Sequence, residues 1–259
     1  MRTFKLDSIV VITACILFLG VSVVHALTVS IEPNKAQREI GGKIRVHIYA
    51  NDADSLISMG VKVTFDPTVL EVVEASKYED LDNGWLMDAD GSASTTDDQH
   101  NDPAVEIDNS TGTVIMIGGH LKGTSTVGLS GKVLLGWIVF QAKANGNSDI
   151  QVDLGKYHPE HPAKTFDNFV KRDGTVDEPT NVPGNLGVIC VMEGACKGDT
   201  NGNGTVGFDD YAKFNAAWNS SFGDPNYDPA CDVDGDGSIF YSDFAAFNSD
   251  WGKVCPACP

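Results

Sequence analysis

The segment DTNGNGTVGFDD at residues 199–210 recurs 33 residues later as DVDGDGSIFYSD at residues 232–243. In both copies aspartate or asparagine stands at positions 1, 3 and 5, glycine at position 6 and aspartate at position 12. A loop with this spacing can supply the roughly six to eight oxygen ligands that calcium prefers, and the glycine permits its sharp turn. Two such loops in register, each followed by the same aromatic spacing, predict two Ca2+ sites.

The predicted ligands are the side-chain oxygens of positions 1, 3 and 5, the backbone carbonyl of position 7 and the carboxylate of position 12. They are Asp199, Asn201, Asn203, Thr205 and Asp210 in the first loop, and Asp232, Asp234, Asp236, Ser238 and Asp243 in the second. The first loop offers two ligand carboxylates and the second offers four. Because more ligand charge generally binds calcium more tightly, the second loop is expected to fill first.

A short helix is expected to begin at position 12 of each loop. Tyr211, Phe214 and Trp218 then share one helix face, and Phe244, Phe247 and Trp251 repeat the spacing. We expect these six rings to form a small core between the two helices, in preference to an exposed sugar-binding platform. So short a module buries little surface, so calcium binding and folding should be coupled.

The first 26 residues have the features of a secretory signal peptide: Arg2 and Lys5, an apolar run from Ile9 to Val24, and a small-residue end at Ala26. An uncleaved anchor is a minority alternative. After cleavage of this segment, the mature chain is expected to be secreted or held at the cell surface and to have no membrane span. Its five remaining cysteines lie in the last 70 residues, which favours a local disulfide in an oxidising compartment. Cys196 could pair with Cys255 or Cys258, and the odd count leaves one thiol unpaired.

The charge balance excludes one class of partner. Acidic residues outnumber basic ones by 36 to 18, which gives a formal charge of −18. Nucleic acid is therefore not expected as a partner, since phosphate binding needs surplus Lys and Arg.

Residues 27 to about 190 show short period-2 runs separated by turn residues, and no long amphipathic helix, which predicts a β-sandwich. The runs are residues 44–49, 61–65, 69–73, 113–117, 133–144, 150–152 and 186–191. The nearly continuous apolar stretch at residues 133–140 is expected to be a central strand. Residues 80–102 and 157–183 are interpreted as long surface loops, and residues 192–197 as a linker to a second module.

The repeat over residues 198–254 resembles a type I dockerin, a duplicated F-hand calcium module. In that family positions 10 and 11 often carry a Ser-Thr pair that contacts the partner. Here these positions are Phe208-Asp209 and Tyr241-Ser242, which makes them candidate partner-binding residues.

Residues 27–191 resemble a cohesin, on the segments GGK (41–43), FDPTVL (65–70) and WIVFQAKA (137–144). Together the two resemblances imply a mainly β fold: a cohesin-like sandwich of the jelly-roll type plus a small α-helical dockerin-like module.

These resemblances imply a non-catalytic scaffold or adaptor that makes calcium-dependent cohesin–dockerin contacts in a polysaccharide-degrading complex. The expected partners are cohesin- or dockerin-bearing proteins, including a second copy of this chain, with polysaccharide as a further possible ligand. One alternative is a carbohydrate-binding sandwich carried by a dockerin, with Tyr78, Trp85 and Tyr157 as stacking candidates. A glycoside hydrolase is a weaker alternative, because no catalytic motif is present and the chain is not expected to be an enzyme.

Overall fold

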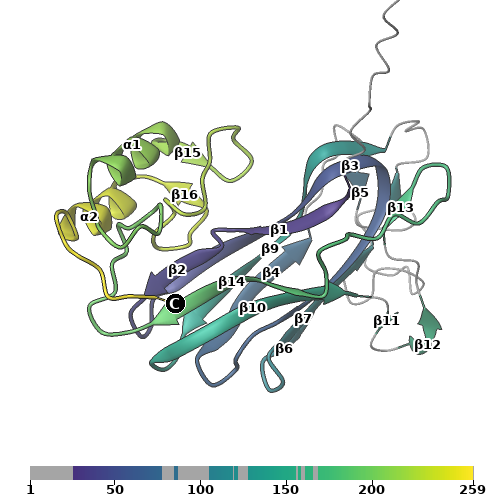
Figure 1. The fold of residues 1–259 in the computed structure, drawn as a ribbon, viewed down its shortest axis with the longest axis horizontal. Helices are drawn as coiled ribbons and strands as arrows, with labels where there is room; N and C mark the ends of the chain where they lie inside the picture. Colours follow the sequence, from purple (N-terminus) through teal and green to yellow (C-terminus); the bar gives the residue numbers. More distant parts are fainter. Residues whose placement is uncertain are drawn as a thin grey trace, which may run out of the picture.

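The computed structural model describes residues 26–77, 85–86, 105–118, 120–121, 128–155, 157–158, 161–165 and 169–258. Its described part is mostly β, with a strand-rich body and a smaller helical module beside it (Figure 1). The main strands are β1 (Thr28–Glu32), β2 (Lys35–Arg38), β3 (Lys43–Thr64), β4 (Leu70–Lys77), β6 (Val105–Asp108), β7 (Thr113–Gly118), β9 (Leu129–Ala142), β10 (Gly146–Leu154), β13 (Val170–Lys171) and β14 (Gly184–Val191). The two helices of this part are α1 (Phe208–Ala217) and α2 (Tyr241–Ser249).

Short strand pairs complete the described elements. They are β5 (Trp85–Leu86) with β8 (His120–Leu121), β11 (Tyr157–His158) with β12 (His161–Thr165), and β15 (Ser220–Ser221) with β16 (Ser238–Ile239).

Strand β3 belongs to both sheets of the sandwich. Its first part pairs with β1 and β9, and β4 continues that sheet beyond β9. Its last part pairs with β7 and β10, and that sheet runs β2-β14-β10-β3-β7-β6. Between the two parts the register shifts, and Asp52 and Ser55 have left-handed φ values of 56° and 52°.

This arrangement corrects one expectation. The runs at residues 44–49 and 61–65 were predicted as separate strands, but they are one bent strand. Bulges take up the extra residues between them without breaking the ladder, which carries the chain from one sheet to the other.

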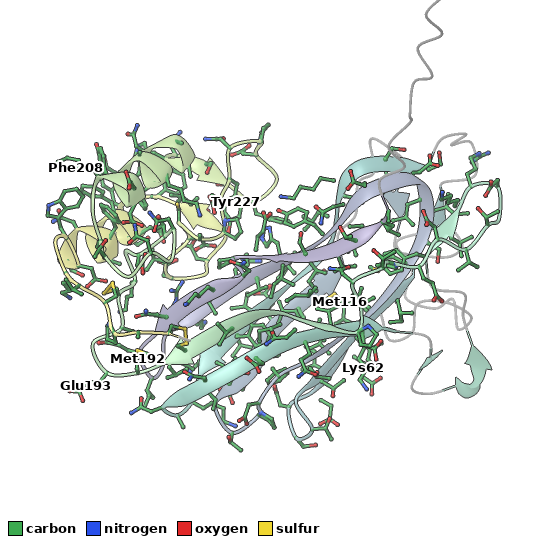
Figure 2. All side chains as sticks on the ribbon, in the orientation of Figure 1. Lys62, Met116, Met192, Glu193, Phe208 and Tyr227 are labelled. Atoms are coloured by element: carbon green, nitrogen blue, oxygen red, sulfur yellow. A yellow bond between two sulfur atoms is a disulfide. The ribbon has the colours of Figure 1, made fainter. Side chains whose placement is uncertain are left out.

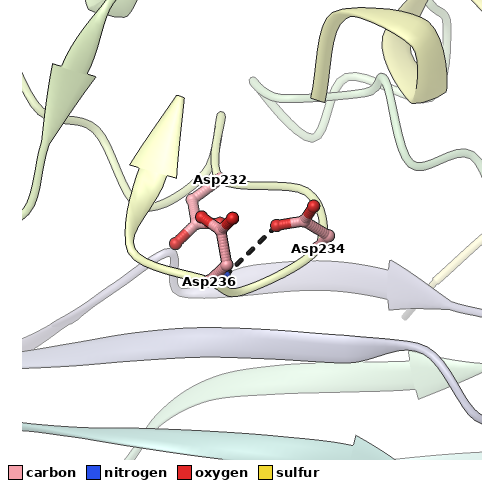
Figure 3. Close-up of side chains that lie close together, drawn as sticks. All are labelled: Asp232, Asp234 and Asp236. Atoms are coloured by element: carbon pink, nitrogen blue, oxygen red, sulfur yellow. Dashed lines mark hydrogen bonds between the residues drawn. The ribbon is translucent and has the colours of Figure 1, made fainter. Parts of the chain in front are cut away.

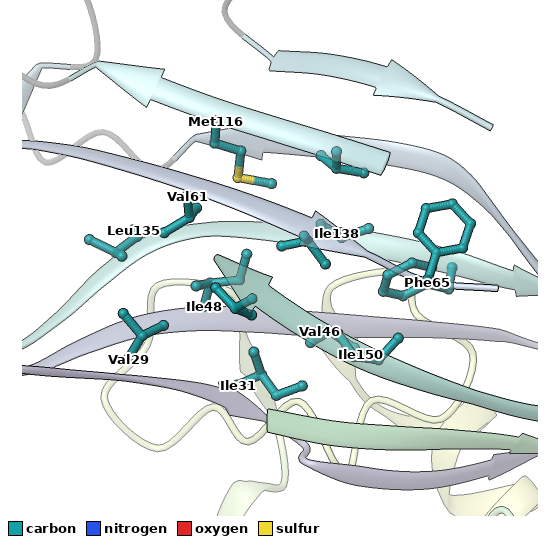
Figure 4. Packing of buried hydrophobic residues seen from close by; sticks show 14 of the residues in the cluster. Val29, Ile31, Val46, Ile48, Val61, Phe65, Met116, Leu135, Ile138 and Ile150 are labelled. Carbon is teal, nitrogen blue, oxygen red and sulfur yellow. The ribbon is translucent and has the colours of Figure 1, made fainter. Parts of the chain in front are cut away.

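The two sheets enclose one apolar core, as a β-sandwich requires (Figure 4). Val46 and Ile48 from one sheet meet Val61 and Ile150 from the other, and all four side chains are buried. Strand β9 has β3 on one side and β4 on the other. The sandwich and the central position of the 133–140 run are therefore confirmed.

The segment 157–183 was predicted to be a surface loop, and this is wrong. It contains β11, β12 and β13, and Phe169 is completely buried in the sandwich core. A single large apolar side chain, which the weak sequence pattern hides, anchors this segment. The other predicted loop, residues 80–102, lies outside the described residues except for Trp85–Leu86, and so does nearly all of the predicted signal segment. No helix in the described part is long and apolar enough to span a membrane.

Candidate metal centre and aromatic face

The first loop folds around its own carboxylates. The N–H groups of Asn203 and Gly204 donate to the two oxygens of Asp199 at 3.0 and 2.9 Å. The N–H groups of Asn201 and Gly207 donate to the two oxygens of Asp210 at 3.1 and 2.9 Å. Positions 1 and 12 are thus both held inside the turn.

The second loop repeats this geometry with more negative charge. The N–H groups of Gly235 and Gly237 donate to Asp232 at 2.8 and 2.9 Å, and those of Val233 and Phe240 donate to Asp243 at 2.7 and 3.0 Å. One carboxylate oxygen from each of positions 1, 3 and 5 lies within 4.8 Å of the other two (Figure 3); these residues are Asp232, Asp234 and Asp236.

The donor set fits calcium. At position 6 of the two loops, Gly204 and Gly237 have φ values of 88° and 91°, the left-handed conformation that the turn needs. Asp232 and Asp243 are fully buried, and burial raises the pKa of both carboxyl groups. Gathered, desolvated carboxylates are costly without a cation, and hard oxygen donors at flexible geometry suit Ca2+. Both loops therefore hold the predicted carboxylates of positions 1 and 12 inside the turn, and the second loop also gathers those of positions 3 and 5.

The side chain at position 5 of each loop accepts a hydrogen bond from the backbone N–H of position 7, which helps to hold the turn. Thr205 donates to the Asn203 side chain through both its N–H and its hydroxyl, at 2.8 Å each. In the second loop the Ser238 N–H donates to Asp236 at 2.8 Å.

Both helices begin two residues earlier than predicted, at position 10 of each loop. Position 12 is therefore the third helical residue, and its carboxylate accepts the N–H of the residue before the helix. The carboxylate thus serves the loop and caps the helix at once. Each loop is rigidly joined to the helix that follows it.

The prediction that six aromatic rings form the core is only partly right. Phe214 and Phe247 are buried and stack at 5.3 Å. Tyr211, Phe244 and Trp251 are instead 43%, 38% and 42% exposed. Two short helices bury only the rings at their crossing, and the outer rings stay at the surface.

The exposed rings form an aromatic face. Phe208 and Tyr241, at position 10 of the two loops, are 80% and 78% exposed, and the neighbouring Asp209 and Ser242 are exposed as well. A groove of about 240 Å3 opens on this face between the two helices. It is lined by Tyr211, Phe214, Asn215, Trp218, Tyr241 and Phe244. All four predicted partner-binding residues thus lie at the surface.

One disulfide closes the module, and a second ties its C-terminal end to the sandwich. Cys196 pairs with Cys255, one of the two pairings left open by the sequence, and Cys190 at the end of β14 pairs with Cys258. In the described part Cys231 is the free cysteine, and burial raises the pKa of its thiol. The segment 192–197, predicted as a linker, is itself held: Cys196 is buried and its N–H donates to Gln37 at 3.3 Å.

The contact between the module and the sandwich was not predicted from the sequence. The Arg45 and His47 side chains of β3 meet Phe222, Tyr227 and Asp232 of the module. Tyr227 lies on the side of the module next to the strands, whereas Phe208 lies on the far side (Figure 2). The only local signal is that alternate residues of one strand, Arg45 and His47, carry polar rings or charge on its outer face.

No protein-family model matches the chain, and no curated protein matches it. Among solved structures it is similar to a chain of a type I cohesin–dockerin complex from Clostridium thermocellum, at 11% identity and a TM-score of 0.44, over 65% of this chain and 100% of that one. It is also similar to the CaCohA2 protein of Clostridium acetobutylicum, at 13% identity and a TM-score of 0.42, over 64% of this chain and 91% of that one. A non-cellulosomal cohesin from the archaeon Archaeoglobus fulgidus is similar at 15% identity and a TM-score of 0.41, over 65% of this chain and 93% of that one.

Proposed function

We propose that this chain is a secreted, non-catalytic adaptor whose helical module binds a partner protein through its aromatic face, with calcium in the two loops. The observation that carries the proposal is the pair of exposed rings, Phe208 and Tyr241, each placed two residues before a buried loop carboxylate. Aromatic residues are enriched at protein interfaces, and exposed apolar side chains that gather into one patch mark interaction sites.

Calcium would act on this face through the shared residues of loop and helix. Asp210 and Asp243 would hold the ion and also cap α1 and α2. A bound ion would therefore fix the first turn of each helix, where Phe208 and Tyr241 stand. Partner binding should fall when calcium is removed, because the first turns then lose this support.

The sequence resemblance guides the choice of partner. A dockerin-like module would bind a cohesin-like sandwich, either on another protein or on a second copy of this chain. In the second case one face meets a different face, so the contact would be heterologous and could extend into a chain of copies. The polysaccharide-degrading setting and export from the cell are parts of the same proposal.

The test uses the full chain, immobilised with calcium and exposed to the secreted and envelope proteins of the source organism. We expect a protein with a cohesin-like sandwich, or this chain itself, in the chelator eluate. Phe208→Ala with Tyr241→Ala should abolish its capture, whereas Ile40→Ala, on an exposed apolar residue of the sandwich, should not. Equal capture by the double variant would disprove the proposed docking face, and equal capture with chelator present throughout would disprove its dependence on calcium.

Polysaccharide binding is a second candidate, and the groove beside Trp218 and Tyr241 favours it. Its aromatic walls and the Asn215 amide are the kinds of group that hold a sugar ring. Retention on polysaccharide gels that Trp218→Ala removes would support this reading. The sandwich-based version rests on Tyr78, Trp85 and Tyr157, whose side chains lie outside the described residues.

A further inference from the structure

The first ligands of the two loops have different surroundings. Asp199 accepts hydrogen bonds from backbone N–H groups of its own loop. Asp232 accepts equivalent bonds, but its Oδ2 also accepts the hydroxyl of Tyr227 at 2.5 Å and lies 3.7 Å from Nε of Arg45. The two loops therefore differ not only in their number of carboxylates but also because Asp232 is contacted by side chains from outside its loop.

Arg45 belongs to the sandwich, not to the module. It lies in β3 and is 6% exposed, and its guanidinium carbon sits 4.2 Å above the ring of Trp137 in β9. One terminal nitrogen donates to the Gly235 carbonyl at 3.3 Å, while Nε has no hydrogen-bond acceptor among the described residues. Arg45 is thus a cation enclosed between the sandwich and the second loop.

Neighbouring contacts hold this arrangement in place. The His47 ring stacks on Tyr227 at 5.5 Å and meets the edge of Phe222 at 5.2 Å. The Gln37 side chain donates to the Pro256 carbonyl at 2.8 Å, next to the Cys190–Cys258 disulfide. The covalent tie keeps the second loop close to Arg45.

A second buried cation lies in the field of the same loop. Arg38 is 4% exposed and donates to the carbonyls of Lys43 and Gln37 at 2.6 and 2.8 Å. Burial lowers its pKa to about 10, while Asp232, Asp243 and Asp234 act in the opposite direction. The second loop therefore has part of its negative charge balanced by the sandwich.

We propose that Arg45 is a fixed cation that lowers the calcium affinity of the second loop, so that calcium binding there and docking of the module on the sandwich oppose each other. This inference rests on the proposed calcium binding. A calcium ion held by Asp232 would lie close to the buried guanidinium, and like charges repel strongly at low dielectric. Linkage is reciprocal, so calcium in the second loop weakens the Arg45 contact by the same factor. The charge advantage of the second loop over the first is thereby reduced.

Calorimetric calcium titrations of the full chain test the proposal. Asp199→Ala with Asp210→Ala silences the first loop, so that the titration reports the second. In that background Arg45→Met should raise calcium affinity by about tenfold or more, since it removes a like charge. Arg45→Lys, which keeps the charge, should stay closer to the parent. Lys132→Met is the matched control, because Lys132 pairs with Glu32 at 2.7 Å on the exposed surface of the same sheet.

The mirror background shows whether the effect is local. Asp234→Ala with Asp243→Ala silences the second loop, and there Arg45→Met should leave the first loop's affinity unchanged. A separate arm keeps Arg45 intact: Cys190→Ser with Cys258→Ser removes the covalent tie, loosens the contact of the module with the sandwich and should raise second-loop affinity. This arm tests the proposal even if Arg45→Met does not fold.

The outcomes separate this inference from the proposed function. The inference alone is overturned if Arg45→Met leaves calcium binding to the second loop unchanged or weaker, and if removal of the Cys190–Cys258 disulfide does not raise it. No calcium binding to the second loop in any variant overturns both the inference and the calcium part of the proposed function. Tighter calcium binding to the second loop, both in Arg45→Met and in the variant without the Cys190–Cys258 disulfide, supports the inference and the proposed function.

Discussion

The indole of Trp251 meets the ring of Phe208 edge-on, with the ring centres 5.2 Å apart. Trp218 makes the equivalent contact with Tyr241 at 5.3 Å. In each pair the tryptophan that follows one helix supports the exposed aromatic residue that opens the other. The aromatic face therefore exists only when the two halves of the repeat fold together, which explains why the halves share their aromatic spacing.

The buried and exposed rings of this module should differ sharply in their effect on stability. Phe247→Ala removes a buried ring stacked on Phe214 and should lower the free energy of unfolding by about 3–5 kcal/mol. Phe208→Ala, at an exposed ring, should change it by no more than about 0.5 kcal/mol. Urea unfolding with calcium present measures both. Similar losses for the two variants would show that the outer rings belong to the core after all.

Calcium should stabilise the module through mass action. At a free calcium concentration about a hundred times the Kd, each occupied loop adds about 2.7 kcal/mol to the free energy of unfolding. Thermal unfolding with calcium and with chelator measures the gain. Asp210→Ala and Asp243→Ala should each reduce the gain by removing one loop. A gain that survives both substitutions together would place the ion elsewhere.

The disulfide that joins the module to the sandwich should add to stability. Cys190→Ser with Cys258→Ser opens a loop of 68 residues and should cost about 2–4 kcal/mol. Cys231→Ala is the matched control, since this buried thiol has no disulfide partner, and it should cost about 1 kcal/mol. Chemical unfolding under non-reducing conditions compares them. Equal losses would indicate that the disulfide constrains little.

The local parts of this molecule were predictable, because short-range spacing determines them. Position 6 must turn sharply and positions 1, 3 and 5 must point inward, so Gly237 and Asp232 could be assigned from the repeat alone. Alternation likewise predicted the sandwich. The predicted strand boundaries were less accurate in β3. Bulges let this strand continue through Asp52 and Ser55, although polar residues of this kind are typical of loops.

The contact between Arg45 and Asp232 could not be predicted in this way. The two residues lie far apart in the sequence, and neither has a neighbour that specifies the other. The pair forms only when the module packs against the sandwich, where Phe222 of the module contacts His47 and Trp137 of the sandwich. Each of these has an ordinary local role in its own strand or loop. Such a relationship is visible only in three dimensions.

The buried His47, at the contact between the sandwich and the module, should also make the stability of the folded chain depend on pH. Burial, and after it the positive charges of Arg45 and Lys132, lower the pKa of His47 from its ordinary 6.5 to about 3. Its other neighbours, Tyr49 and Tyr227, are neutral rings near neutral pH. The unfolded chain therefore takes up the His47 proton first, and the folded state loses stability as pH falls from about 6.5 towards 3.

Replacing His47 tests this pH dependence directly. His47→Gln removes the titrating group, so its unfolding free energy should fall less steeply between pH 6 and 4.5, by about 1.4 kcal/mol per pH unit. Tyr49→Phe serves as the control, because it removes the hydroxyl 3.2 Å from His47 Nδ1 and leaves the imidazole. Urea unfolding across this pH range gives the two slopes. If the unfolding free energy of His47→Gln fell with pH as steeply as that of the parent, the acid sensitivity of the chain would have to come from other groups.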